Sequence, residues 1–217
     1  MIKGILFDLD GTLVYTLIDL NNAINYALEN NGLKTISIDK TKEFIGSGIK
    51  NLVLKAIDNK IEIFNEVYHD FKKYYHNNIN NNSTPYNGVV ELLKSLKENN
   101  IKIAVVSNKY QEGVEKICIP LFSEYSNVFI GARDNINIKP SSDMVNLALN
   151  KLNLNNNECL FVGDSNVDIM TAKNSNMKSI GVLWGYKDVS NATYKVNTPN
   201  EILDIIRKEN ENGKSLY

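Results

Sequence analysis

Short apolar segments recur along the chain at wide intervals, and longer stretches with helical periodicity separate them. The apolar runs, rich in isoleucine and valine, occupy residues 2–7, 101–106, 128–130, 159–162 and 179–184. Such runs are typical of strands in a parallel sheet that is buried on both faces. Apolar residues at helical spacing follow near 89–96, 145–152 and 202–206. This alternation predicts an α/β fold with a doubly wound, Rossmann-like parallel sheet.

The interval between the first strand and residue 88 has helical patterning without a convincing strand. Thr16 and Asp19 have the spacing of a capping box at the start of a helix. Further helical segments are predicted over 44–57 and 61–75, although a return strand could be hidden in this interval. We predict two domains: an α/β catalytic core formed by residues 1–14 and 86–217, and a small all-helical cap domain inserted at residues 15–85.

Composition and charge narrow the classes of partner. The 24 basic and 25 acidic residues leave a formal net charge of -1, which argues against a nucleic-acid groove or a polybasic membrane surface. No apolar stretch approaches the ~18–20 residues of a membrane span, and the N-terminal run is short for a secretory signal. Cys118 and Cys159 lack metal-site spacing. We therefore expect a soluble, cytoplasmic protein with reduced thiols and no nucleic-acid or membrane partner.

Charged and polar residues follow the predicted strands, at the edge of the sheet where ligands bind in folds of this class. They are Asp8, Asp10, Ser107, Asn108, Lys139, Asp164 and Asp168. Burying this much charge without a partner is costly, and a divalent cation together with a phosphate group would neutralise it. Carboxylate and carbonyl oxygens are the ligands that Mg2+ prefers.

The residue types also suggest a reaction. A carboxylate such as Asp8 can attack a phosphorus atom and form an aspartyl-phosphate that water then hydrolyses. Asp10, two residues on, can protonate the leaving oxygen and then activate water. Lys139 and Ser107 would hold the phosphoryl oxygens.

Each of these residues also has a plainer interpretation. Asp8 and Asp10 can be turn formers, and Lys139 can be a solvated surface residue. Asp164 and Asp168 can stabilise the start of a helix from Ser165. Ser107-Asn108 can cap a helix. Residues 46–48 can form a turn between helices.

The chain resembles the haloacid dehalogenase (HAD) superfamily, and within it the phosphoglycolate phosphatase-like branch. Four segments carry the resemblance in the order of that superfamily: FDLDGTLV at 7–14, VVSNK at 105–109, KPS at 139–141 and FVGDSNVDI at 161–169. Gly46-Ser47-Gly48 is similar to a cap turn of that branch, with serine in place of its usual asparagine.

The resemblance implies a Mg2+-dependent phosphatase with a role for each motif residue. Asp8 would be the nucleophile, Asp10 the acid/base, and Lys139 a further catalytic residue. The metal would be held by Asp8, Asp10 and Asp164, with Asp168 in the outer shell. Contacts to phosphate or substrate are expected from Ser107, Asn108, Lys139, Gly11, Thr12, Gly46, Ser47 and Gly48.

The sequence therefore predicts a phosphatase acting on a small phosphorylated metabolite, with 2-phosphoglycolate as the leading candidate. A phosphomutase or phosphotransferase, a pyrophosphatase and a nucleotide or sugar-phosphate phosphatase are alternatives within the same fold. A non-catalytic binding module is an alternative from another class. The substrate stays open because Tyr15-Thr16 and Ser47 depart from the pattern of the branch in the predicted cap. The oligomeric state, monomer or homodimer, stays open as well.

Overall fold

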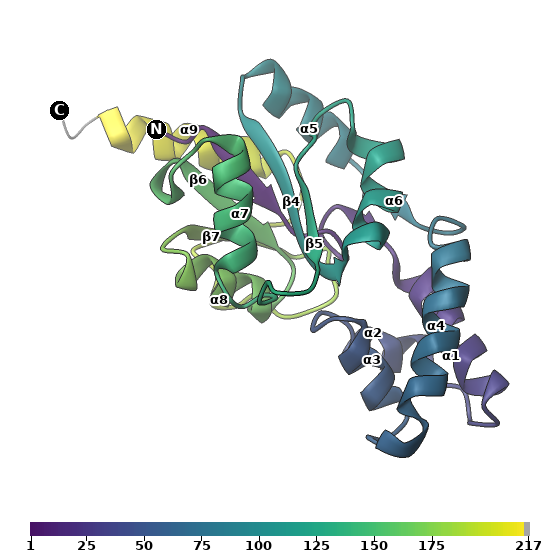
Figure 1. Cartoon of the computed structure of the whole chain (residues 1–217). Helices are drawn as coiled ribbons and strands as arrows, with labels where there is room; N and C mark the ends of the chain where they lie inside the picture. Colours follow the sequence, from purple (N-terminus) through teal and green to yellow (C-terminus); the bar gives the residue numbers. More distant parts are fainter. Residues whose placement is uncertain (215–217) are drawn as a thin grey trace.

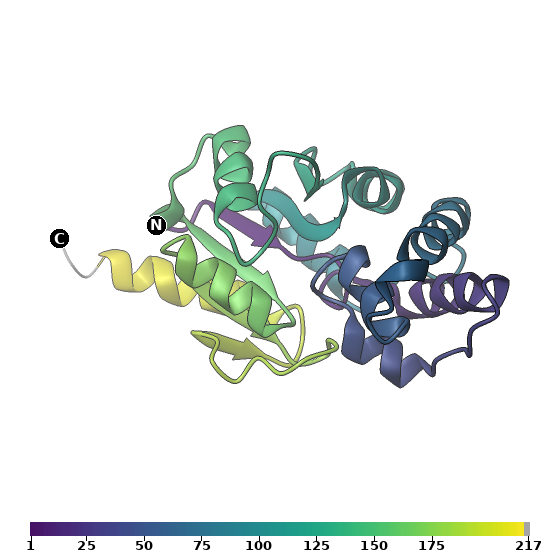
Figure 2. The ribbon, with the colours of Figure 1, turned by 60° about the horizontal axis from the view of Figure 1, so that its bottom comes forward.

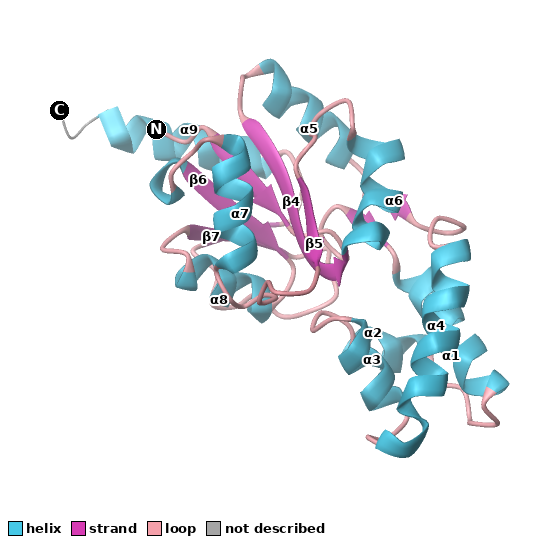
Figure 3. Cartoon of the chain, in the orientation of Figure 1, coloured by secondary structure: helices cyan, strands magenta, loops and turns pink. Residues whose placement is uncertain are grey.

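The computed structural model, which describes residues 1–214, contains a six-stranded parallel sheet (Figure 3). Its strand order is β5-β4-β1-β6-β7-β8, with every neighbouring pair parallel. The strands are β1 (Gly4–Phe7), β4 (Lys102–Tyr110), β5 (Phe129–Ala132), β6 (Cys159–Gly163), β7 (Lys178–Val182) and β8 (Tyr194–Val196). The predicted α/β class is therefore confirmed. The chain leaves central β1 toward β4 on one side and reaches β6 on the other, so the strand order reverses at β1.

Helices cover both faces of this sheet (Figures 1 and 2). Alternate residues of β1 pack on opposite faces: Ile5 and Phe7 belong to one hydrophobic cluster and Leu6 to the other. The first cluster includes side chains of α5 (Val89–Glu98), α6 (Gln111–Phe122) and α9 (Glu201–Lys214). The second includes side chains of α7 (Asp143–Leu152) and α8 (Asn166–Asn174). A short 3-10 helix, η2 (Asn156–Glu158), precedes β6.

A separate group of helices lies beyond the carboxyl ends of the strands (Figure 1). The group comprises α1 (Leu17–Asn30), α2 (Ile38–Phe44), α3 (Ile49–Ala56), the 3-10 helix η1 (Ile61–Ile63) and α4 (Phe64–Asn78). Two short strands connect it to the rest of the chain, β2 (Val14–Tyr15) and β3 (Thr84–Pro85), which pair antiparallel. The predicted boundary at 14/15 falls within β2, and the one at 85/86 falls directly after β3.

Three local differences from the sequence-based expectations have physical causes. The helical segment predicted over 44–57 is two helices, because Gly46 and Gly48 adopt positive φ angles of 108° and 84° that end α2 and begin α3. Strands β2, β3 and β8 were not predicted, since two or three residues are too few to show an alternating pattern. The other strands coincide with the apolar segments that predicted them, although β4 continues four residues past 106 into polar residues.

The predicted capping box at Thr16 and Asp19 is wrong, although α1 does begin at Leu17. The Thr16 side chain makes no capping hydrogen bond. The buried Asp19 carboxylate instead accepts hydrogen bonds from the Asn82 backbone N–H and from the Ser83 hydroxyl. These bonds join the first turn of α1 to the segment that leads into β3, so both connections of the helical group are tied together.

Cys118 and Cys159 are buried free thiols, as expected from their spacing. Within residues 1–214, no helix has the length and apolar character needed to cross a membrane.

Candidate active site

The register of the sheet brings three separate segments to one edge. Phe7 of β1 lies between Val105 of β4 and Val162 of β6. The next residue, Asp8, continues the pairing, because its N–H donates to the Val162 carbonyl at 2.8 Å. The residues that follow these three positions therefore meet at the carboxyl ends of the strands. They line a small cavity of about 50 Å³ between the sheet and the helical group.

Most of the residues singled out from the sequence line this cavity. They are Asp8, Asp10, Ser107, Asn108, Lys139, Asp164, Asp168, Gly46 and Gly48. Apolar side chains of the helical group close the opposite wall: Leu20, Ile45, Ile49 and Leu52. The cavity thus has one highly charged wall and one apolar wall.

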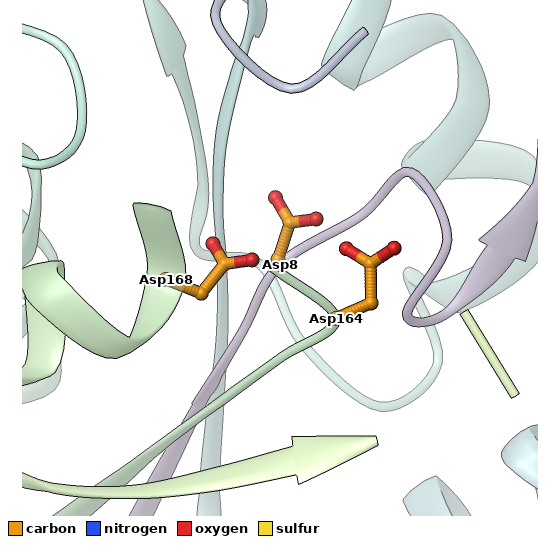
Figure 4. Close-up of side chains that lie close together, drawn as sticks. All are labelled: Asp8, Asp164 and Asp168. Atoms are coloured by element: carbon orange, nitrogen blue, oxygen red, sulfur yellow. The ribbon is translucent and has the colours of Figure 1, made fainter. Parts of the chain in front are cut away.

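Three carboxylates converge on the charged wall (Figure 4). Asp8 follows β1, Asp164 follows β6, and Asp168 lies in the first turn of α8. Each offers one oxygen, and these oxygens lie within 4.8 Å of one another. All three residues are buried, with exposed fractions of 7%, 3% and 1% respectively. Turn formation alone does not account for three buried carboxylates that face one another.

Lys139 is the cation within this cluster. Its Nζ lies 2.6 Å from Asp8 Oδ1 and 2.6 Å from Asp168 Oδ1. With only 4% of its surface exposed, Lys139 is not a solvated surface residue. Asp168 is fully engaged, because its Oδ2 also accepts from the N–H and hydroxyl of Ser165 in a capping box that begins α8.

Two carboxylate oxygens in the cluster remain available to a ligand. Asp8 accepts a hydrogen bond through Oδ1, and Asp164 accepts one through Oδ2 from the Tyr186 N–H at 2.6 Å. Within the described part of the chain, Asp8 Oδ2 and Asp164 Oδ1 have no hydrogen-bond donor. A hard divalent cation needs oxygen ligands of this kind.

The pKa shifts of the clustered side chains also favour a bound cation. Burial raises the pKa of Asp8 to about 7, and the nearby Asp168 and Asp10 add to the effect while Lys139 opposes it. Burial, reinforced by Asp168 and Asp8, likewise raises the pKa of Asp164. Burial disfavours the charge on Lys139, but the Asp168 and Asp8 carboxylates outweigh it and raise the pKa of that lysine. One lysine therefore faces an excess of negative charge, which a cation would neutralise.

This excess predicts a pH-dependent stability for the metal-free protein. Asp8 has a pKa of about 7 when folded and an ordinary value near 3.8 when unfolded, so the folded state binds more protons between these values. The free energy of unfolding should therefore fall as pH rises from about 4 to about 7. We expect Asp8→Asn to remove this component when melting temperatures are measured across that range in chelator. A wild-type profile that rises relative to the variant would contradict the prediction.

Asp10 lies on the side of the cavity nearer the helical group. Its Oδ1 lies 3.0 Å from Lys109 Nζ and accepts a hydrogen bond of 2.5 Å from the Thr16 hydroxyl. Lys109 is buried and also donates to the Tyr75 hydroxyl of α4 at 2.6 Å. Lys109 was not predicted as a site residue. Its position two residues after Ser107 in a strand was the signal, because alternate strand residues share a face.

Ser107 and Asn108 lie within β4, and α6 begins later, with Tyr110 as its N-cap residue. The helix-cap interpretation of the pair is therefore wrong. Asn108 connects two sides of the cavity: its Nδ2 donates to the carbonyls of Gly46 and Lys139, and its Oδ1 accepts from the Lys139 N–H at 2.8 Å. Ser107 is buried at the cavity wall.

Three predicted residues do not lie on the cavity surface. Gly11 has a φ of 84° and packs so tightly on Asp164 that a Cβ would lie 2.3 Å from Oδ2. Thr12 is buried, and its carbonyl accepts from Trp184 Nε1 at 3.1 Å. Ser47 lines a neighbouring hollow outside the carboxylate cluster. Gly11 and Thr12 thus shape the loop that supports the site, while Gly46 and Gly48 reach the cavity.

Comparison with known proteins identifies the class of enzyme. The profile of the haloacid dehalogenase-like hydrolase family matches residues 5–182, and the chain belongs to that family. The four motifs lie within this match, and so do the strands of the parallel sheet from β1 to β7, apart from Gly4 at the start of β1. The resemblance seen in the sequence is therefore confirmed.

Individual relatives include phosphoglycolate phosphatases and a provisionally named pyrophosphatase. The chain is 32% identical to a phosphoglycolate phosphatase of Aquifex aeolicus (strain VF5), over 94% of this chain and 96% of the relative. It is also 32% identical to a provisionally named pyrophosphatase of Caldanaerobacter subterraneus subsp. tengcongensis, over 84% and 82%. A crystal structure of a provisionally named phosphoglycolate phosphatase from Lactobacillus delbrueckii subsp. bulgaricus superposes with a TM-score of 0.90 at 31% identity, covering 94% of this chain and 98% of that one.

Proposed function

We propose that the protein is a Mg2+-dependent phosphatase that hydrolyses a small phosphomonoester, with 2-phosphoglycolate as the leading candidate. The observation that carries the proposal is how the Asp8 carboxylate is hydrogen-bonded and where it lies. This buried carboxylate has one oxygen held by Lys139 and the other without a protein donor in the described residues, beside Asp164. The family and the phosphoglycolate phosphatase relatives support this assignment.

The donor set fits Mg2+. An octahedral magnesium ion spans ~4 Å between opposite ligand oxygens, close to the 4.8 Å within which the carboxylate oxygens gather. We assign the carboxylates of Asp8 and Asp164 and the main-chain carbonyl of Asp10 as ligands. Asp168, whose oxygens are already engaged, belongs to the outer shell. When bound, the ion supplies positive charge that offsets the carboxylates and the phosphoryl oxygens.

The reaction then proceeds in two phosphoryl transfers, first to Asp8 and then to water. An Asp8 oxygen attacks the phosphorus, and the bond from phosphorus to the leaving oxygen breaks as Asp10 donates a proton to that oxygen. Asp10 next takes a proton from the water that attacks the aspartyl-phosphate, which releases phosphate and restores Asp8. Lys139 and Ser107 hold the phosphoryl oxygens, with Asn108 beside them. Lys109 and Thr16 hold the Asp10 carboxyl in position.

We further propose that residues 15–85 act as a cap on a core formed by residues 1–14 and 86–217. The contacts Asn108–Gly46 and Lys109–Tyr75 join the two parts, and both core residues line the cavity. The apolar wall from Leu20 to Leu52 would exclude bulk water while the aspartyl-phosphate exists. The ribbon of β2 and β3 is the natural hinge.

Phosphate release from 2-phosphoglycolate and from p-nitrophenyl phosphate tests the proposed function. We expect Mg2+ to support turnover of both, chelation by EDTA to lower the rate by at least ~100-fold, and added Mg2+ to restore it. Heat-denatured protein treated identically is the control. Turnover that persists in EDTA would contradict the metal assignment, and no hydrolysis of either ester would contradict the function.

A further inference from the structure

Lys187 is a cation at the cavity that the reaction steps above do not use. It lies in the loop after β7, two residues beyond Gly185, whose backbone packs against the Asp164 side chain. Its side chain lines the same cavity as the carboxylates. The Nζ donates to the main-chain carbonyl of Glu43, in the last turn of α2, at 2.7 Å. Lys187 thus reaches from the core to the helical group across the cavity mouth.

Charges of both signs act on the Lys187 ammonium, which keeps N–H donors free in the part of the chain that the structure describes. Partial burial, together with the positive charges of Lys55 and Lys42, lowers the pKa of Lys187, although Asp164 and Glu43 act in the opposite direction. An ammonium group has three N–H donors, and Glu43 provides the one acceptor seen in residues 1–214. Two N–H donors of the Lys187 ammonium are therefore available for an anion.

The neighbouring wall restricts what that anion can belong to. Leu20, Ile45, Ile49 and Leu52 have apolar side chains that offer no hydrogen bond to a hydroxyl-rich leaving group. A leaving group that suits this end of the cavity lacks a chain of hydroxyls, and its own negative charge would be met by Lys187.

We propose that Lys187 determines specificity by donating to a second anionic group on the leaving side of the substrate. This inference rests on the proposed phosphatase function and deepens it. The preferred substrates would carry a carboxylate or a second phosphate a few bonds from the phosphoryl group that is transferred. 2-Phosphoglycolate and pyrophosphate both have this chemistry, whereas ethyl phosphate has a similar size without the second anion.

Steady-state kinetics with these three compounds and Mg2+ test the inference. The wild type should show a higher kcat/KM for an anionic substrate than for ethyl phosphate. We expect Lys187→Met to raise KM for that anionic substrate by roughly 10- to 100-fold and to change kcat/KM for ethyl phosphate by less than about 3-fold. Lys187→Arg should retain most of the preference, because it keeps the charge.

Lys42→Met is the matched control. It removes the same charge near the mouth, but Lys42 does not line the cavity, so we expect a change below about 3-fold on every substrate. An effect of Lys187→Met on 2-phosphoglycolate identifies a carboxylate as the anion, and an effect on pyrophosphate identifies a phosphate.

Three results would overturn the inference while leaving the proposed function intact. They are an equal loss on ethyl phosphate, no change on either anionic substrate, and a wild type that hydrolyses ethyl phosphate as well as the anionic compounds. The first would mean that Lys187 only holds the helical group through Glu43. Failure of the wild type to hydrolyse any of the three compounds would instead contradict the proposed function.

Discussion

Asp8→Asn should lower kcat for 2-phosphoglycolate by roughly 10⁴-fold or more and leave the protein folded. An amide is a very poor nucleophile, and asparagine has almost the same shape as the carboxylate that it replaces. Asparagine also removes one buried negative charge from a cluster in which burial raises the pKa of Asp8 to about 7. The variant should therefore be at least as stable as the metal-free wild type above pH 7.

The measurement is single-turnover and steady-state phosphate release, with circular dichroism and thermal melting on the same samples. Asp204→Asn is a matched control, because Asp204 is an exposed aspartate of α9 that forms a surface ion pair with Arg207. We expect that control to keep wild-type activity. Substantial turnover by Asp8→Asn, in a folded sample free of deamidated protein, would remove Asp8 from the mechanism.

Lys139→Met should have the largest effect on stability. Lys139 Nζ contacts both Asp8 and Asp168 at 2.6 Å, and all three side chains are buried. Removing the cation leaves two uncompensated carboxylates, and breaking a buried ion pair in this way costs about 3–5 kcal/mol. The loss should appear in denaturant unfolding of the metal-free protein near pH 8. Activity should fall by about 10²- to 10³-fold, because the phosphoryl oxygens also lose a donor.

A second substitution separates charge from packing. Adding Asp168→Asn to Lys139→Met removes one of the unpaired carboxylates, so the double variant should regain part of the lost stability without regaining activity. Lys173→Met, at an exposed lysine of α8, is the control and should change stability by less than about 0.5 kcal/mol. A Lys139→Met variant as stable as the wild type would show that the cluster tolerates its charge without this lysine.

The meeting of Asp8, Asp164 and Asp168 could be predicted from the sequence for a physical reason. Parallel strands place their carboxyl ends at one edge, so residues that directly follow such strands must lie near one another whatever the length of the intervening chain. The apolar runs identified those strands, and the motif residues followed them. Lys139 was harder to place, because it lies in a loop, and the family resemblance supplied its position.

Contacts between the core and the helical group could not be predicted in the same way. Lys109 meets Tyr75, and Lys187 meets the Glu43 carbonyl, across long separations in sequence that no local pattern encodes. Thr16 had the right spacing to cap a helix, yet its hydroxyl instead donates a hydrogen bond to the half-buried Asp10 carboxylate. Gly11 was predicted as a phosphate contact, and the structure adds a second requirement at this position, because a Cβ there would clash with Asp164.

A crystal structure of the protein with Mg2+ and beryllium trifluoride, which mimics a phosphoryl group on a carboxylate, tests the central claim most directly. The account predicts that the fluoride adduct is attached to an Asp8 oxygen. It also predicts that one magnesium ion touches both Asp8 and Asp164, and that Lys139 and Ser107 donate to the fluorines. An adduct on another residue, or carboxylates of Asp8 and Asp164 that share no ion, would contradict it.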